Sequence, residues 1–81
     1  MIKVYGADWC KDTKRSLNFL DTMGIDYQYI NVEQDAAASE WVKNQNEGKE
    51  RKPTIRIGER VLSVPSDGEL NSALQEAKLI S

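Results

Sequence analysis

The stretch Tyr5-Gly6-Ala7-Asp8-Trp9-Cys10-Lys11-Asp12-Thr13 decides how this chain folds. Before it, Ile2–Tyr5 alternates and is rich in strand-forming residues, which predicts a β-strand ending at Gly6. After it, apolar and small residues recur at steps of three and four, which predicts a helix: Ser16, Leu17, Phe19, Leu20 and Met23. Gly24 then suits the C-terminal cap of that helix. Cys10, the only cysteine, is therefore expected at or just before the first helical turn.

The middle of the chain predicts a second strand and a second helix. Residues 27–32 place two tyrosines on one strand face and Ile30 and Val32 on the other. Because both faces are partly apolar, we expect a sheet that is covered on both sides. Asp35 is a candidate N-cap for a helix with apolar residues at helical spacing. The polar segment 44–52 that follows is predicted to be a loop.

The last third predicts a hairpin and a third helix. Residues 54–57 and 60–64 read as antiparallel strands joined by Gly58-Glu59, a connection that suits a type II′ turn. The run Ser66-Asp67-Gly68-Glu69 has the spacing of a capping box, and Leu70, Ala73, Leu74 and Ala77 continue as a helix. The whole chain, residues 1–81, is thus predicted to be one α/β domain of order βαβαββα. A right-handed first crossover makes its first two strands parallel, so the four-stranded sheet is mixed and flanked by helices.

Composition narrows the function classes. The chain has no histidine, which excludes a Ser–His or Cys–His pair, and its cysteine and histidine content offers no zinc cluster. The formal charge of −2 gives no broad basic field for nucleic acid, and no apolar run approaches the ~20 residues of a membrane span. The segment Met1–Val4 has no signal-peptide layout. We therefore expect a cytoplasmic monomer in a reducing compartment, where a lone thiol stays free.

Three motifs, together with the order of elements, carry a resemblance to a known family. Trp9-Cys10 lies at the first strand–helix junction, Lys52-Pro53-Thr54 precedes the third strand, and Pro65-Ser66 opens the last helix. In this order and at this length, the chain resembles the thioredoxin fold in its minimal glutaredoxin form. The second half is especially similar to the small glutaredoxin-like proteins that include the mycoredoxins. Segments 30–35, 52–55 and 60–66 carry that similarity.

The resemblance implies a site and an activity. It implies a thiol–disulfide oxidoreductase in which Cys10 is the catalytic nucleophile, supported by Trp9, Lys11, Thr13 and Pro53. Pro53 is then a cis-proline beside the thiol. The segment Lys52-Pro53-Thr54 offers backbone groups to a thiol ligand, while Ser66 and Asp67 hold a carboxylate of that ligand at a helix start. No metal and no bound cofactor are expected. The implied partners are a low-molecular-weight thiol as cosubstrate and disulfide-containing client proteins.

The chain departs from the family pattern at three places. Thr13 stands where a second cysteine is common, so the Trp-Cys-Lys-Asp-Thr site is predicted to be monothiol. Lys11-Asp12 differs from the Gly-Phe of the iron–sulfur-binding monothiol class, which argues against an iron–sulfur role. Val64-Pro65 replaces a double glycine before the last helix, so the cosubstrate stays open between glutathione, mycothiol and bacillithiol.

The residues around Cys10 bear on its reactivity, because the thiolate is the nucleophile. The helix N-terminus and the Lys11 charge lower the pKa of a thiol placed there, whereas Asp8 and Asp12 raise it. Since the helix amides act at contact distance, we expect a lowered pKa for Cys10. Thr13 has two open interpretations: its hydroxyl donates to the sulfur, or it fills space on the buried side of the helix.

Three of these features also have an alternative interpretation without a catalytic role. A lone cysteine is often a small buried hydrophobe. Trp9 is either a contact surface for a partner or a half-exposed core residue. Segment 49–52 is either a solvated loop or a cationic wall that faces carboxylates of a thiol ligand.

Three functional hypotheses remain. The first is a monothiol glutaredoxin-like enzyme that reduces mixed disulfides through Cys10. The second is a thioredoxin-fold binding module that has lost turnover and uses the Pro53 groove to recognise a peptide. The third is an iron–sulfur carrier in which Cys10 from two copies bridges a cluster.

Overall fold

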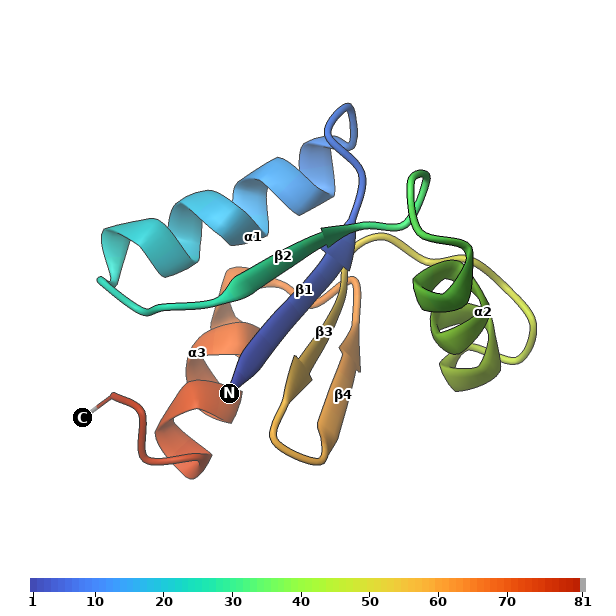
Figure 1. Cartoon of the computed structure of the whole chain (residues 1–81). Helices are drawn as coiled ribbons and strands as arrows, with labels where there is room; N and C mark the ends of the chain where they lie inside the picture. Colours follow the sequence, from blue (N-terminus) through green and yellow to red (C-terminus); the bar gives the residue numbers. More distant parts are fainter. Residues whose placement is uncertain (81) are drawn as a thin grey trace.

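The computed structural model describes residues 1–80, and within them four strands and three helices follow the predicted order (Figure 1). The strands are β1 (Ile2–Gly6), β2 (Gln28–Asn31), β3 (Thr54–Ile57) and β4 (Arg60–Ser63). The helices are α1 (Lys11–Thr22), α2 (Ala36–Gln45) and α3 (Asp67–Glu76). The predicted order βαβαββα is confirmed.

The four strands form one mixed sheet in the order β2-β1-β3-β4. β1 pairs in parallel with β2, as the right-handed crossover predicts, and β3 runs antiparallel to both β1 and β4. In this register Val4 lies opposite both Tyr29 and Ile55, and Ile55 lies opposite Leu62. This row of apolar side chains crosses the sheet and supplies one face of the core.

Helices cover both faces of the sheet, as the apolar strands predicted (Figure 1). One core cluster joins α1 and α3 to the sheet: Ile2, Val4, Leu20, Ile55, Ile57, Leu70, Ala73 and Leu74. A smaller cluster joins α2 to the other face: Tyr5, Val32, Ala38 and Val42. Trp41 of α2 stacks on Tyr5 with ring centroids 4.5 Å apart. This contact packs α2 against β1 at the residue directly before Gly6.

The helix ends follow their local sequences. Gly24 has φ +69°, and its N–H donates to the Asp21 carbonyl while the Ile25 N–H donates to the Leu20 carbonyl, which is a Schellman C-cap. Asp35 accepts from the Ala38 N–H at 3.0 Å as the N-cap of α2. The capping box predicted at the start of α3 is present in both directions.

Three elements differ in their bounds from the sequence prediction. The strand predicted over 60–64 ends at Ser63. Val64 still donates its N–H to the Pro53 carbonyl in the register of the ladder, but Val64 has φ +45° and Pro53 has no N–H to return the second bond. The second strand spans 28–31 rather than 27–32, and α2 continues to Gln45, so the polar loop is shorter than predicted. The hairpin turn is as predicted, with φ +62° at Gly58 and no positive φ at Glu59.

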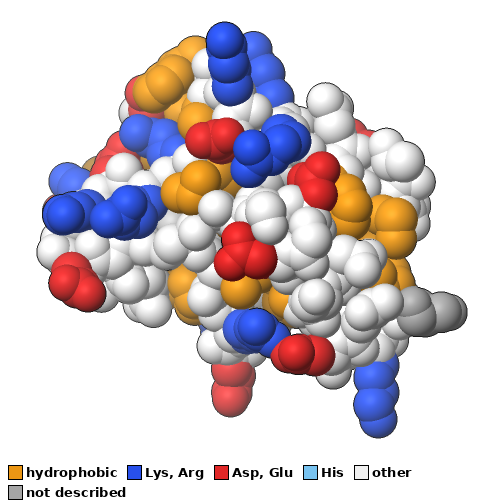
Figure 2. Space-filling view, turned by 180° about the vertical axis from the view of Figure 1, so that it is seen from behind, with side chains coloured by type: hydrophobic (Ala, Val, Ile, Leu, Met, Phe, Trp, Pro, Cys, Tyr) orange, Lys and Arg blue, Asp and Glu red, His pale blue; other side chains and the backbone are white. Residues whose placement is uncertain are grey.

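The surface carries charges of both signs. Figure 2 shows Lys and Arg side chains interspersed with Asp and Glu over the visible face, with apolar side chains between them. In the described part of the chain, no helix is long and apolar enough to cross a membrane.

Candidate active site

Cys10 is the N-cap residue of α1, where the sequence placed it. Its carbonyl accepts the Lys14 N–H at 3.0 Å, and its own N–H donates to the Ala7 carbonyl at 3.1 Å. No side-chain cap is present, so N–H groups of the first helical turn stay available to the sulfur. The thiol is free and partly exposed. It therefore lies at the carboxyl end of β1 with donors directed at it.

The pKa of the Cys10 thiol is lowered, as the sequence predicted. Burial raises the pKa, but a hydrogen bond from the Thr13 hydroxyl outweighs it, together with the backbone N–H groups of Thr13 and Asp12. The negative charge of Asp12 raises the pKa by a smaller amount. The thiolate is thus stabilised by donors at contact distance. The sequence-based prediction had also included the Lys11 charge, which is not among these causes.

Thr13 fulfils both of its interpretations. It is fully buried between α1 and β1, and a Cβ added at Gly6 would lie 2.5 Å from both Cγ2 and Oγ1 of Thr13. The Ala7 N–H donates to the Thr13 hydroxyl at 3.5 Å. The absence of a side chain at Gly6 therefore allows the start of α1 to approach the sheet and places the Thr13 hydroxyl beside the sulfur.

The segment before β3 faces the thiol from the opposite side. The Lys52–Pro53 peptide bond is cis, as the resemblance implied, and Cys10 Sγ donates to the Lys52 carbonyl at 3.7 Å. Thr54 is buried, and its hydroxyl donates to the Arg51 carbonyl at 2.8 Å and accepts from Asn46 at 3.2 Å. The side chain of Thr54 is therefore used inside the fold, and its backbone lies in the sheet opposite Tyr5 and Ser63. Within this segment, the backbone nearest the thiol is that of Lys52.

Trp9 and Lys52 form the exposed rim of the site. Trp9 is 62% exposed, and its Nε1 donates to the Glu33 carboxylate at 2.8 Å. Lys52 Nζ lies 5.2 Å from the centroid of that ring and 2.7 Å from the Glu50 carboxylate. Lys52 and Ser39 both hydrogen-bond Glu50 and lower its pKa. The Lys52 amine is thus paired with Glu50. The cationic wall suggested for segment 49–52 therefore lacks the Lys52 charge.

Ser66 and Asp67 lie at the start of α3. The Ser66 N–H donates to Glu69 at 2.9 Å and its hydroxyl accepts from the Glu69 N–H, so both groups are used by the capping box. This pairing lowers the pKa of the Glu69 carboxyl. In the described part of the chain, the N–H groups of Asp67 and Gly68 have no acceptor. These two amides, rather than that of Ser66, are the donors open to an anion.

Arg15 links α1 to the start of α3, although none of the sequence motifs singles it out. Its guanidinium contacts the Asp12 carboxylate at 3.0 Å, the Pro65 carbonyl at 3.1 Å and the Asp67 carboxylate at 3.8 Å. The spacing of Asp12 and Arg15 on one helix face signalled the first of these pairs. The other two join residues about fifty positions apart, which no local pattern indicates.

Glu33 was also missed, although a signal existed for it. It follows β2, and the carboxyl ends of parallel strands meet at one edge of a sheet, so residues after β1 and β2 are neighbours. The same edge brings the Tyr29 hydroxyl to within 2.7 Å of the Asp8 carboxylate. Among residues 1–80 no group of three or more His, Cys, Asp or Glu side chains is placed to hold a metal ion.

Comparisons with known proteins agree with this architecture. The family model described as Glutaredoxin matches residues 2–62. Mycoredoxin 1 of Corynebacterium glutamicum is 40% identical over 58 residues, which cover 72% of this chain and 71% of that protein. The family match includes Cys10 and Pro53 and ends before Ser66 and Asp67.

Two solved structures show the same fold. The glutaredoxin-like protein NrdH-redoxin from Escherichia coli superposes with a TM-score of 0.78 at 22% identity, covering 88% of this chain and 91% of the other. A glutaredoxin from Archaeoglobus fulgidus gives a TM-score of 0.75 at 19% identity, covering 91% of this chain and 85% of the other. The predicted thioredoxin-type fold, a mixed four-stranded sheet with flanking helices, is confirmed.

Proposed function

Because the chain belongs to the glutaredoxin family, we propose that it is a monothiol thiol–disulfide oxidoreductase, which reduces mixed disulfides through Cys10 with a low-molecular-weight thiol. The observation that carries the proposal is the lowered pKa of a partly exposed Cys10 at a helix start, facing the Lys52–Pro53 segment. A thiolate in that setting is a nucleophile with room for a disulfide partner. The proposal includes a cytoplasmic monomer that binds no metal.

The reaction proceeds by two thiol–disulfide exchanges. The Cys10 thiolate attacks the small-thiol sulfur of a client mixed disulfide, a new Cys10–small-thiol disulfide forms, and the client cysteine leaves as a thiolate. A second small-thiol anion then attacks the small-thiol sulfur of that adduct. The products are the oxidised small-thiol disulfide and the free Cys10 thiolate. Thr13 has no sulfur and cannot attack the Cys10 adduct, so the thiolate that attacks it in the second exchange comes from the small thiol.

The surrounding residues have distinct parts in this proposal. The Thr13 hydroxyl and the first-turn amides stabilise Cys10 as attacking and leaving group. The backbone of Lys52 aligns the ligand against the sulfur, and Pro53 and Thr54 hold that backbone in place beside Cys10. The Asp67 and Gly68 amides receive a ligand carboxylate at the start of α3, with Ser66 fixing that start through its capping box. Trp9 provides apolar contact area at the rim.

The similarity to Mycoredoxin 1 makes mycothiol the first cosubstrate to test, ahead of glutathione and bacillithiol. The assay measures reduction of a client-peptide mixed disulfide prepared with each of the three thiols, supplied in turn as reductant. We expect turnover with at least one thiol, and none in the Cys10→Ser variant, which keeps the shape of the site. Absence of turnover with all three, despite rapid alkylation of Cys10 at neutral pH, would refute the proposal in favour of a binding module.

A further inference from the structure

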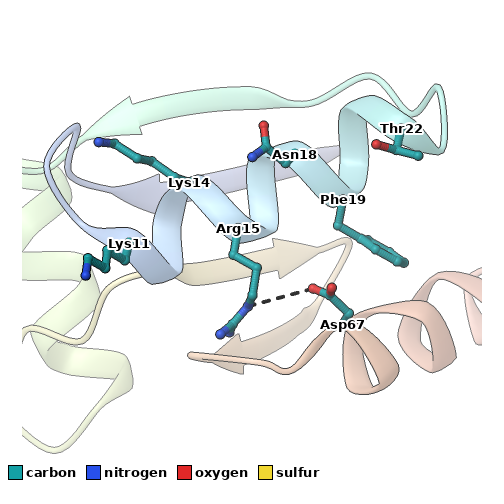
Figure 3. Close-up of a pocket in the computed structure, with 7 residues that line it drawn as sticks. All are labelled: Lys11, Lys14, Arg15, Asn18, Phe19, Thr22 and Asp67. Atoms are coloured by element: carbon teal, nitrogen blue, oxygen red, sulfur yellow. Dashed lines mark ion pairs between the residues drawn. The ribbon is translucent and has the colours of Figure 1, made fainter.

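A groove separates α1 from the start of α3 beside the proposed active site (Figure 3). Its volume is about 500 Å³, and its walls include Lys11, Lys14, Arg15 and Phe19 of α1 and Asp67 of α3. We call it the α1–α3 groove. It begins at Lys11, which follows Cys10 directly, and it shares Asp67 with the proposed thiol site. The groove therefore lies next to the proposed thiol site, although Cys10 itself does not line it.

The charge of the α1–α3 groove is opposite to that of the chain. Three cationic side chains and one carboxylate line it, whereas the whole chain carries a formal charge of −2. Asp12 and Asp67 contact the Arg15 guanidinium at 3.0 Å and 3.8 Å. Lys11 and Lys14 form no ion pair within residues 1–80. The unpaired positive charge thus lies at the end of the groove nearest Cys10.

The far end of the groove carries no charge, since Phe19 and two uncharged polar side chains line it. Figure 3 shows Arg15 and Phe19 directed from α1 toward α3, one helical turn apart. Phe19 is partly buried against the core, so its ring is a fixed apolar wall. From Lys11 to Thr22, α1 rises by about 16 Å, which is the length of roughly five extended residues. The groove therefore fits a short peptide segment with anionic groups near Cys10 and an apolar side chain farther on.

We propose that the α1–α3 groove binds the client protein's own segment beside its mixed-disulfide cysteine, and that it selects segments carrying acidic side chains followed by an apolar one. The proposal rests on the proposed function, which brings the client's mixed disulfide to Cys10. The small thiol is the less favoured occupant. Its carboxylate binds the Asp67 and Gly68 amides in the proposed function, so it does not need the lysines at the other end of the groove. A client segment with acidic side chains is long enough to follow α1 along the groove, and its charge is complementary to Lys11 and Lys14.

A binding experiment tests this independently of turnover. The Cys10→Ser protein is titrated with a short peptide that carries two Glu and one Leu after a Ser in the place of its cysteine, and with its Gln counterpart. Backbone amide NMR shifts in α1 and α3 report the binding. We expect the Glu peptide to bind about three- to tenfold more tightly, the size of one or two exposed ion pairs. Lys14→Glu in the same background should remove that preference.

Lys78→Glu is the matched control, because it makes the same change of charge at the opposite end of α3. It should keep the preference for the Glu peptide. Equal binding of the two peptides, or an equal loss in the Lys14→Glu and Lys78→Glu proteins, overturns the proposal.

A turnover experiment separates the two possible occupants. With Cys10 intact, Lys14→Glu should lower kcat/KM about three- to tenfold for the mixed disulfide of an acidic peptide. It should leave unchanged the rate for a mixed disulfide between the small thiol and 2-mercaptoethanol, which has no peptide part. A loss with both substrates would assign the groove to the small thiol and overturn the client assignment. No turnover in the unmodified protein, with the NMR preference intact, would refute the proposed function and leave the docking surface standing.

Discussion

The contact between Gly6 and Thr13 gives the sharpest test of how the fold positions Cys10. Gly6→Ala adds one methyl group, and this group would lie 2.5 Å from Cγ2 and Oγ1 of Thr13. Thr13 is fully buried, so it has no free space to move into. Gly6 has no positive φ, which means that backbone strain does not contribute. We therefore expect Gly6→Ala to destabilise the protein by about 1–3 kcal/mol, the usual cost of overpacking.

The sign of this effect is informative, because Gly-to-Ala changes otherwise stabilise by about 0.4–1 kcal/mol through the unfolded chain. Gly68 is the matched control: a Cβ there has its nearest neighbour, Ser66 Oγ, at 3.9 Å, within the first turn of α3. Gly68→Ala should therefore raise stability by about 0.5–1 kcal/mol. Urea unfolding followed by far-UV circular dichroism measures both variants. For a chain of this size, a loss of about 2 kcal/mol lowers Tm by roughly 8–16 °C.

A double variant distinguishes this contact from a general effect on the strand. Thr13→Ala removes both atoms that meet the new methyl group, so the Gly6→Ala/Thr13→Ala protein should be more stable than the sum of the single changes predicts, by about 1–2 kcal/mol. Additive losses, or a neutral Gly6→Ala, would refute the reasoning that Gly6 is required for the approach of α1 to β1.

Three further predictions concern polar groups. Thr13→Val keeps the side-chain shape and removes the hydroxyl that lowers the pKa of Cys10, so the midpoint of Cys10 alkylation against pH should move upward; an unmoved midpoint contradicts the assigned donor. Ser16→Ala removes a buried hydroxyl that has no hydrogen-bond partner among the described residues, so urea unfolding should show a gain of about 1 kcal/mol, and a loss would reveal a partner. Asn46→Ala breaks hydrogen bonds to the α2 backbone at 2.7 Å and to Thr54 at 3.2 Å, which should cost about 1–3 kcal/mol in the same assay, whereas a neutral change would show that this buried network adds nothing.

Much of the fold was predictable because its signals are local. A glycine with positive φ after α1, an aspartate before α2 and a serine before α3 each act on backbone groups within a few residues. Strand alternation and helical spacing likewise depend on near neighbours, and chain order then limits the topology. The strand boundary at Val64 was wrong because the residue opposite Val64 is Pro53, which lies eleven positions earlier and has no N–H to return a second bond.

The candidate site was predictable only in part. Sequence alone placed Cys10 at a helix start, and the donors that lower its pKa belong to the same turn, so the direction of the shift followed from local geometry. Assigning Cys10, Pro53, Ser66 and Asp67 to one site came from the family resemblance. Their assembly remains a functional prediction, although the structure does bring the Lys52 carbonyl to the sulfur.

Sequence by itself therefore determined the elements, their order and a thiol at the first strand–helix junction. Tertiary structure alone decided which distant residues meet near that junction. Arg15 reaches the Pro65 carbonyl across fifty positions, Trp9 reaches Glu33, and Lys52 lies over Trp9. These contacts depend on how strand pairing and helix packing bring separate segments to one edge of the sheet. No spacing within the chain encodes that placement, because each pair exists only once the core has formed.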